Sequence, residues 1–285
     1  MPPPPDAGPG RLRGKARDWS VTTSGAFLVA LGLLAIVGPM VSRYGYDTQD
    51  LDYLFAGPDW AHWLGTDQYG RDLLTRVLDG ARVSLTVGLT AVLAESLLGV
   101  AWGTIAGFAA GRLDSILMGM VDVLLAFPAL LLAVLITGIF GTSLVNIVIA
   151  LMMTAWPGMA RTVRSEVVAL RGREHVEAAR ALGAAPRRIL LHHLVPNTLH
   201  LVTARATLDV SAVILIEATL SFIGIGVQPP RPSWGLMISE SFQFLHSHPF
   251  LLVVPATVLS LTVIAFNLVG QALTQRLDPS LRRSA

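Results

Sequence analysis

The chain has 285 residues, of which 53% are hydrophobic and only 14% are charged, and its formal net charge is +2. A soluble domain carries about 25% charged residues, so this composition excludes an ordinary soluble protein. The chain has no cysteine, which excludes disulfide bonds, thiolate metal sites and cysteine nucleophiles.

Six apolar stretches are each long enough to cross the hydrocarbon core of a bilayer, which takes about 20 helical residues. They are Ser24–Ser42, Val83–Ala109, Ile116–Ile139, Leu144–Ala160, Leu199–Ile225 and Phe250–Leu273. The pieces between them are too short to bury cores of their own. The sequence therefore predicts an all-α integral membrane protein with six transmembrane helices.

The first stretch follows a basic, proline-rich segment, residues 1–23, which we expect to be a disordered cytoplasmic tail. No small-residue cleavage site follows the stretch, so it is interpreted as a retained helix rather than a signal peptide. The expected organisation is this first helix with its outer loop (24–82), a five-helix core (83–275) and a second cytoplasmic tail (276–285).

Basic residues are concentrated in alternate connecting pieces. Fifteen of the 21 lysines and arginines lie in the tails and in residues 110–115 and 161–198. Because lysine and arginine resist translocation, this side is expected to face the cytoplasm. The sequence thus predicts a multi-pass protein of the cell membrane with both termini inside, and nothing indicates nucleic-acid binding.

The outer loop leads into the second span through an aliphatic segment, residues 73–78, which is expected to lie as a short helix along the outer membrane surface. Asp72 and Arg76 are expected to pair at i, i+4. The tryptophans expected in an interfacial aromatic belt are Trp60, Trp63 and Trp234.

The second span contains glycines at a strict spacing of four residues, namely Gly99, Gly103, Gly107 and Gly111. Residues four apart lie along one stripe of a helix, and small residues let helices approach closely in lipid. The stripe predicts helix packing, either inside this chain's own bundle or against another subunit.

Charged residues within the predicted spans are Glu95, Asp122, Arg205, Asp209 and Glu217. A charge in the bilayer centre costs ~3 kcal/mol or more, so such groups face the bundle interior and mark a pathway or a pair. Arg205 and Asp209 are spaced to neutralise each other. Asp122 lies near the inner end of its helix. For Glu95 and Glu217, a polar pathway or inter-helix role and a neutralised structural role both remain open.

No catalytic constellation is evident. The Gly14-Lys15 pair lacks the spacing and the following serine or threonine of a phosphate-binding loop. The two close histidine pairs lack the spacing and supporting carboxylates of a metal site. We therefore expect no catalytic residue, no metal ligand and no cofactor on this chain.

The inner loop, residues 161–198, is too polar to span the membrane and too regular to be a linker. Glu174–Leu182 is predicted to form a short helix that ends at a left-handed Gly183. A second helix, Pro186–Leu194, is expected to be separated from the fifth span by Pro196 and Asn197.

One side of the first of these loop helices carries Val176, Ala179 and Leu182, with Ala178 beside them. This apolar side is expected to be exposed. It suits either a groove in a partner protein or the surface of anionic lipid, and on the residues alone the two are equal.

Glu177-Ala178-Ala179 is followed three residues later by Gly183, and then by His193-Leu194-Val195-Pro196-Asn197. This pattern resembles the EAA loop of binding-protein-dependent ABC importer permeases, which docks on a cytoplasmic ATPase. The general family pattern has Ile and Leu at 193 and 195, but the histidine is typical of the peptide and nickel branch. The residues that the resemblance assigns to ATPase coupling are Glu174, Val176, Glu177, Ala178, Ala179, Leu182 and Gly183.

Three further stretches are similar to the C-type permease of dipeptide, oligopeptide and nickel importers. They run from His62 to Leu85, through Ala126-Phe127-Pro128, and from Leu220 to Gly235. The resemblance covers roughly residues 51–279 and leaves out the proline-rich tail.

The resemblance implies a type I ABC importer permease-like bundle with a cytoplasmic coupling helix. The implied partners are a second permease in a heterodimer, two ABC ATPases that bind ATP and Mg²⁺, and an extracytoplasmic substrate-binding protein. The implied cargo is a dipeptide, an oligopeptide, glutathione or a nickel chelate. The chain itself is then a transport subunit without enzymatic activity.

A different reading of the same spans is a stand-alone ion-coupled transporter or channel that uses the intramembrane carboxylates as a relay. It predicts an internal inverted repeat, and none is visible in the sequence. An intramembrane enzyme is disfavoured because no nucleophile is paired with a base.

Overall fold

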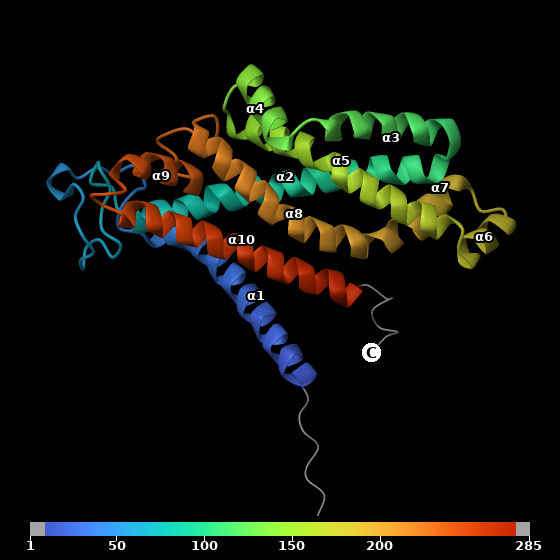
Figure 1. The fold of residues 1–285 in the computed structure, drawn as a ribbon, viewed down its shortest axis with the longest axis horizontal. Coiled ribbons are helices and arrows are strands. Elements are labelled where there is room, and N and C mark those ends of the chain that lie inside the picture. Colours follow the sequence, from blue (N-terminus) through green and yellow to red (C-terminus); the bar gives the residue numbers. More distant parts are fainter. Residues whose placement is uncertain (1–8, 278–285) are drawn as a thin grey trace, which may run out of the picture.

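The computed structural model describes residues 9–277, which are helical almost throughout and contain no β-strand (Figure 1). The longer helices are α1 (Pro9–Val41), α2 (Leu73–Ala109), α3 (Gly111–Ala126), α4 (Ala129–Phe140), α5 (Leu144–Arg171), α8 (Val195–Ile223) and α10 (Phe250–Leu277). The shorter ones are α6 (Glu174–Ala181), α7 (Pro186–Ile189) and α9 (Trp234–Ser241), together with a π turn over Leu190–Leu194.

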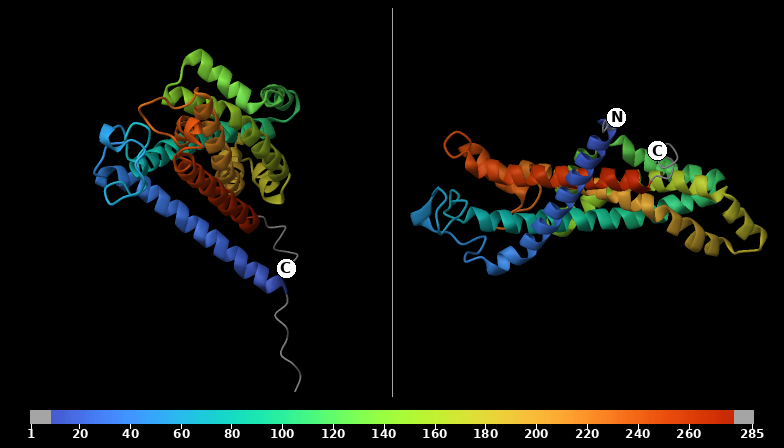
Figure 2. Two further views of the ribbon diagram at one scale, coloured as in Figure 1. Left: turned by 60° about the vertical axis from the view of Figure 1, so that its left-hand side comes forward. Right: turned by 90° about the horizontal axis from the view of Figure 1, so that it is seen from below.

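Helices α2, α5 and α8 run together along the long axis, and α10 packs beside α8 (Figure 1). Helix α1 crosses the bundle at a steep angle, as Figure 2 shows. One end of the bundle carries residues 42–72 and α9 and is called here the α9 end. The opposite end carries α6 and α7 and is called the α6 end.

Five helical segments are long and apolar enough to span a membrane, namely Trp19–Val41, Leu73–Ala109, Leu144–Arg171, Pro186–Ile223 and Phe250–Arg276. These confirm five of the six predicted spans. The third predicted span, Ile116–Ile139, is not one straight helix. It is the pair α3 and α4, which meet at an angle of 88°.

The break between α3 and α4 has a local cause. Phe127 precedes a proline and takes an extended conformation (φ −85°, ψ 135°). The ring of a proline such as Pro128 disfavours helical geometry in the residue before it. The chain therefore leaves α3 at Phe127 and begins α4 after Pro128, so the pair is either a broken span or a re-entrant loop.

Several helices are longer than predicted. Helix α1 begins at Pro9, so residues 9–23 are helical rather than disordered, while residues 1–8 and 278–285 of the two expected tails lie outside the described part. Helix α2 begins at Leu73, ten residues early, and continues straight through the segment that was expected to lie along the membrane surface. Helix α5 runs on to Arg171, into the predicted inner loop.

Asp72 is the N-cap of α2, and this overturns its predicted pair with Arg76. Its carboxylate accepts hydrogen bonds from the backbone N–H and the hydroxyl of Thr75 (2.8 and 2.7 Å) and contacts Nδ1 of His62 (2.9 Å). An N-cap side chain turns back toward the first helical turn, which points it away from the residue four positions on.

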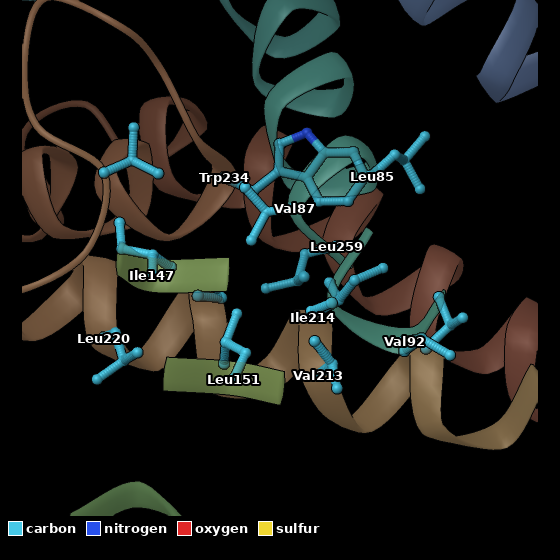
Figure 3. Close-up of a cluster of buried hydrophobic side chains, with 14 of the residues drawn as sticks. Leu85, Val87, Val92, Ile147, Leu151, Val213, Ile214, Leu220, Trp234 and Leu259 are labelled. Atoms are coloured by element: carbon cyan, nitrogen blue, oxygen red, sulfur yellow. The ribbon is translucent and has the colours of Figure 1, made fainter. Parts of the chain in front are cut away.

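The main apolar core lies where α2, α5, α8 and α10 meet. Figure 3 shows Val87 and Val92 of α2, Ile147 and Leu151 of α5, and Ile214 of α8 converging there. Trp234 of α9 closes this core: its side chain is fully buried, and its indole N–H donates to the carbonyl of Val77 (3.2 Å). Trp234 is therefore a core residue, not part of an interfacial belt, whereas Trp60 and Trp63 are exposed.

The α2–α5 contact depends on glycine. A Cβ atom at Gly99 would lie 2.6 Å from the Cβ of Met159, and one at Gly107 would lie 2.9 Å from the Cβ of Val167. Gly103 sits equally close to the backbone of α5. Three of the four stripe glycines thus pack inside this chain's own bundle.

Gly111 does not belong to this stripe. Helix α2 ends at Ala109, and both Ala110 (φ 56°) and Gly111 (φ 62°) have positive φ in the turn to α3. Nothing lies within 4 Å of a Cβ built at Gly111. Its role is to reverse the chain, because glycine adopts positive φ without steric cost.

Candidate functional site

Helix α6 is a two-turn helix at the end of the bundle, close to the predicted boundaries. Glu174 and Glu177 lie in its first turn and Arg180 in its last, an arrangement that the helix dipole favours. At its C-terminus Gly183 adopts φ 80°, which confirms the left-handed cap, and the N–H of Ala184 reaches back to the carbonyl of Ala179 (3.0 Å).

Val176 anchors α6 to the rest of the chain. Its side chain is fully buried and packs in a cluster with Leu170 at the end of α5, Ile189 of α7 and Leu194 of the π turn. The expectation that Val176 lies on an exposed side with Ala179 and Leu182 is therefore wrong. A two-turn helix such as α6 is too short to be stable alone and needs a packing contact with the rest of the protein. Val176 provides that contact by packing into the protein's own core.

The opposite surface of α6 is open. Leu182 is 89% exposed, and Glu174, Glu177, Ala178 and Gly183 are also exposed. An exposed leucine of this kind beside a short capped helix can anchor another protein, because its burial on docking is worth about 1.5–3 kcal/mol.

A turn over residues 182–185 follows α6, and the path from α7 to the end of α8 is one continuous helical rod. Helix α7, the π turn and α8 follow one another without a break, so the predicted separation at Pro196 and Asn197 is wrong. Pro196 sits in the first turn of α8, where its missing N–H is tolerated. The N–H of Val195 instead donates to the carbonyl of Leu190, which keeps the helix intact.

Glu217 lies at the centre of a buried hydrogen-bond cluster near the α9 end. Its carboxyl group accepts from the hydroxyls of Ser84 on α2 (3.0 Å) and Ser221 on α8 (2.8 Å). Ser221 in turn accepts from the N–H of Val227 (3.0 Å). The carboxyl group thus joins two helices and the segment that leads to α9.

Glu95 is also fully buried, but neither of its carboxyl oxygens has a hydrogen-bond partner in the described part of the chain. Arg205 and Asp209 of α8 interact with it electrostatically. These two form the predicted i, i+4 ion pair, with Arg205 Nε 2.8 Å from Asp209 Oδ2, which confirms that prediction.

Asp122 lies apart from both groups. It pairs with Arg161 of α5, and the two side chains are 62% and 56% exposed. The structure therefore does not bring Asp122, Glu95 and Glu217 together in one place, as a continuous ion relay would require.

The α9 end holds a charged network that the sequence did not reveal. Arg76 is almost fully buried and contacts Asp67 (3.3 Å) and Glu240 (2.9 Å), and Arg71 binds the same two carboxylates (2.6 and 3.2 Å). Arg71, Arg76 and Asp67 lie within the His62–Leu85 stretch that the resemblance covers. The arginines' other partner, Glu240, stands more than 160 residues later, and no local pattern links it to them.

Within residues 9–277 no three His, Asp or Glu side chains are placed to hold a metal ion. Three candidate features therefore remain. They are the exposed surface of α6 at one end, the buried carboxyl groups of Glu95 and Glu217 in the bundle, and the ion-pair network of Arg71 and Arg76 at the α9 end.

Two protein-family models match this chain. Residues 99–283 match the family model described as binding-protein-dependent transport system inner membrane component. Residues 17–58 match the N-terminal transmembrane domain of oligopeptide transport permease C.

Characterised relatives are similar over almost the whole chain. The oligopeptide transport system permease protein OppC of Bacillus subtilis is 41% identical over 90% of this chain and 84% of its own. The dipeptide permease DppC of the same organism is 42% identical over 90% and 80%. The glutathione transport system permease protein GsiD of Pectobacterium atrosepticum is 36% identical over 93% and 89%.

A solved structure has the same fold. The inward-facing MetNI methionine ABC transporter contains a chain that matches with a TM-score of 0.58 and 18% identity, covering 71% of this chain and 96% of that one.

Proposed function

Because the chain belongs to the family of binding-protein-dependent transport system inner membrane components, we propose that it forms, with a second permease, the translocation pathway of an ATP-driven importer. Its cargo is a short peptide or a related small solute. The observation that carries the proposal is α6, a capped helix with an exposed apolar tip, rigidly connected to the transmembrane bundle.

ATP binding and hydrolysis are assigned to two separate ATPase subunits on the cytoplasmic side. The positive-inside distribution of lysine and arginine favours a cytoplasmic position for the α6 end, where the ATPases would dock. Both termini are then cytoplasmic, and the α9 end faces the substrate-binding protein.

Helix α6 is the proposed coupling element. Glu174, Glu177, Ala178, Leu182 and Gly183 face outward and would contact the ATPase, with Ala179 partly covered. Val176 acts differently from the other residues in the resemblance. It carries the displacement of α6 inward, because it packs directly on α5 and on the rod that leads into α8.

Closure of the two ATPases on ATP would therefore move α6, and with it α5 and α8 relative to the other permease. A packed interface has discrete alternative arrangements rather than continuous ones, so this motion exchanges which side of the pathway is open. The receptor provides most of the selectivity, and the pathway needs only weak substrate contacts.

The named relatives support the substrate class. Their names specify oligopeptide, dipeptide and glutathione transport, and all three cargoes are short chains of amino acids. The stand-alone ion-coupled transporter is not favoured, because its three candidate carboxylates are separate and one of them is exposed and ion-paired.

The experiment is the purification and reconstitution of the chain with its cognate second permease, ATPases and receptor. Glu177→Arg combined with Ala178→Arg is expected to abolish co-purification of the ATPases and ATP-driven peptide uptake, while the chain still inserts in the membrane. Asp52→Arg combined with Gln49→Arg is the control, because this pair makes the same charge change on two exposed residues at the α9 end.

Uptake driven by an ion gradient in vesicles that contain this chain alone would overturn the proposal. So would full ATPase association and uptake with both α6 residues changed.

A further inference from the structure

A cavity of about 500 Å³ opens between α2 and α5 at the α9 end. Its mouth is lined by Tyr46, by Asp79 and Arg82 of α2, and by Arg231 of the segment before α9. Its size lies within the range of about 300–1,000 Å³ that is typical of sites for small ligands.

The charged groups at this mouth are free, in contrast to those beside them. Asp79, Arg82 and Arg231 make no ion pair or hydrogen bond through their side chains within the described residues, although Arg82 and Arg76 act on Asp79 electrostatically. The neighbouring Arg71 and Arg76 are instead buried and fully paired with carboxylates. The mouth therefore presents both signs of charge without a hydrogen-bond or ion-pair partner among the described residues.

The floor of the cavity is apolar. It is formed by Val83 and Val87 of α2 and by Leu144 and Val148 of α5. Thr90 also reaches it, but its hydroxyl is already bonded to the carbonyl of Thr86 (2.6 Å). Thr86 lines the cavity too, and no hydrogen bond among the described residues uses its hydroxyl. The charged groups are thus confined to the mouth, and below them the lining is apolar apart from these two threonines.

We propose that this cavity is a transient site for the zwitterionic main chain of a short peptide, with its carboxylate on Arg82 and Arg231 and its ammonium group on Asp79. The proposal rests on the proposed function and specifies where in this chain the cargo first binds.

The spacing agrees with this assignment. Residues three apart on a helix have Cβ atoms about 5–6 Å apart, and two extended residues span about 7 Å. Asp79 and Arg82 can therefore meet the two ends of a dipeptide at once, and Arg231 adds a second guanidinium group at the same mouth from a separate segment. Arginine suits the carboxylate end, because its guanidinium group binds carboxylates with two parallel hydrogen bonds.

The test is uptake by the complete importer in vesicles, with saturating receptor and a radiolabelled mixture of dialanine, trialanine and glutathione. Combined Arg82→Gln and Arg231→Gln is expected to lower the uptake rate at least about tenfold, since the loss of even one charged hydrogen bond weakens binding by about that factor. Asp79→Asn is expected to give a smaller loss, and Arg82→Lys with Arg231→Lys to restore part of the rate.

Arg43→Gln is the matched control, because Arg43 is an exposed arginine near the same end but outside the cavity. Co-purification of the ATPases and ATP hydrolysis in the absence of receptor are measured in parallel and should not change in any variant. This separates loss of a cargo site from loss of assembly.

Unchanged uptake in the Arg82/Arg231 variant would overturn the site while leaving the proposed function intact. A wild-type importer that accumulates none of the three probes would overturn the substrate class and the site together. Loss of assembly in the variant would overturn the cargo site and show instead that the cavity is a contact surface for the second permease. Uptake rates that depend on phosphatidylethanolamine in the vesicles, but not on Arg82 and Arg231, would overturn the cargo site and show that a lipid headgroup occupies the cavity.

Discussion

The hydroxyl group of Ser84 on α2 donates a 3.0 Å hydrogen bond to the carboxyl group of Glu217 on α8. Both side chains are fully buried. Together with the bond from Ser221, this contact crosslinks α2 and α8 close to Trp234, which closes the apolar core. A buried carboxyl group with two hydroxyl donors is well suited to fix the positions of helices.

Replacement of Glu217 by leucine is expected to lower the free energy of unfolding by about 1–3 kcal/mol, because two buried hydroxyls lose their acceptor. Glu217→Gln keeps an acceptor oxygen and should lose less. The midpoint of thermal unfolding in detergent, followed by tryptophan fluorescence, measures both. Thr219→Leu, on the exposed side of the same helix, should leave the midpoint unchanged. A stable Glu217→Leu protein without uptake would instead give Glu217 a role in the pathway.

The glycine seam between α2 and α5 leads to a second prediction. A Cβ atom at Gly103 would lie 2.9 Å from the backbone nitrogen of Arg164 and from the Cβ of Val163. Gly103→Ala is therefore expected to destabilise the bundle by about 1–3 kcal/mol through overpacking. Gly119→Ala is the control, because nothing lies within 4 Å of its Cβ position on α3. Equal unfolding midpoints for the two variants would show that α5 moves aside without cost.

Short-range patterns in the sequence predicted the parts of this protein that local chemistry determines. The length of the apolar stretches predicted five of the spans, and the four-residue spacing of Arg205 and Asp209 predicted their ion pair. The end of α6 followed from Gly183, since a left-handed residue is needed there and glycine supplies it.

The parts that were missed depend on partners distant in the chain. Val176 looked exposed because the sequence does not show that Ile189 and Leu194 fold over it. Trp234 looked interfacial because its acceptor, the carbonyl of Val77, lies 157 residues earlier. The Arg76–Glu240 contact was missed for the same reason. The bend at Phe127 is different, because its cause is local: Pro128, the next residue, disfavours helical geometry there.

The third prediction concerns Asp122. Its ion pair with Arg161 is exposed on both sides, and exposed pairs contribute at most about 1 kcal/mol. Asp122→Asn should therefore retain uptake within roughly twofold. Asp114→Asn should be more harmful to stability, because Asp114 is only 14% exposed and Arg164 binds it through Nε and Nη2 (3.1 and 2.5 Å). Loss of transport in Asp122→Asn with an unchanged unfolding midpoint would revive the ion-relay interpretation.

The fourth prediction concerns the tip of α6. Leu182 is 89% exposed, so replacing it costs this chain almost no packing energy, and any effect must come from a partner that covers it. Leu182→Asp is expected to weaken ATPase association roughly tenfold to a hundredfold, which corresponds to the loss of about 1.5–3 kcal/mol of leucine burial.

Leu182→Met is the matched control, because methionine keeps an apolar side chain of similar volume. ATPase retained on the purified permease and receptor-stimulated ATP hydrolysis measure the effect, and a monodisperse elution profile verifies that the variant has folded.

Val176→Ala should behave in the opposite manner, because that side chain is buried in the chain's own core. It is expected to lower the unfolding midpoint and to uncouple hydrolysis from uptake while the ATPases remain bound. If Leu182→Asp retained its ATPases and only Val176→Ala lost them, the exposed face of α6 would not be the docking surface.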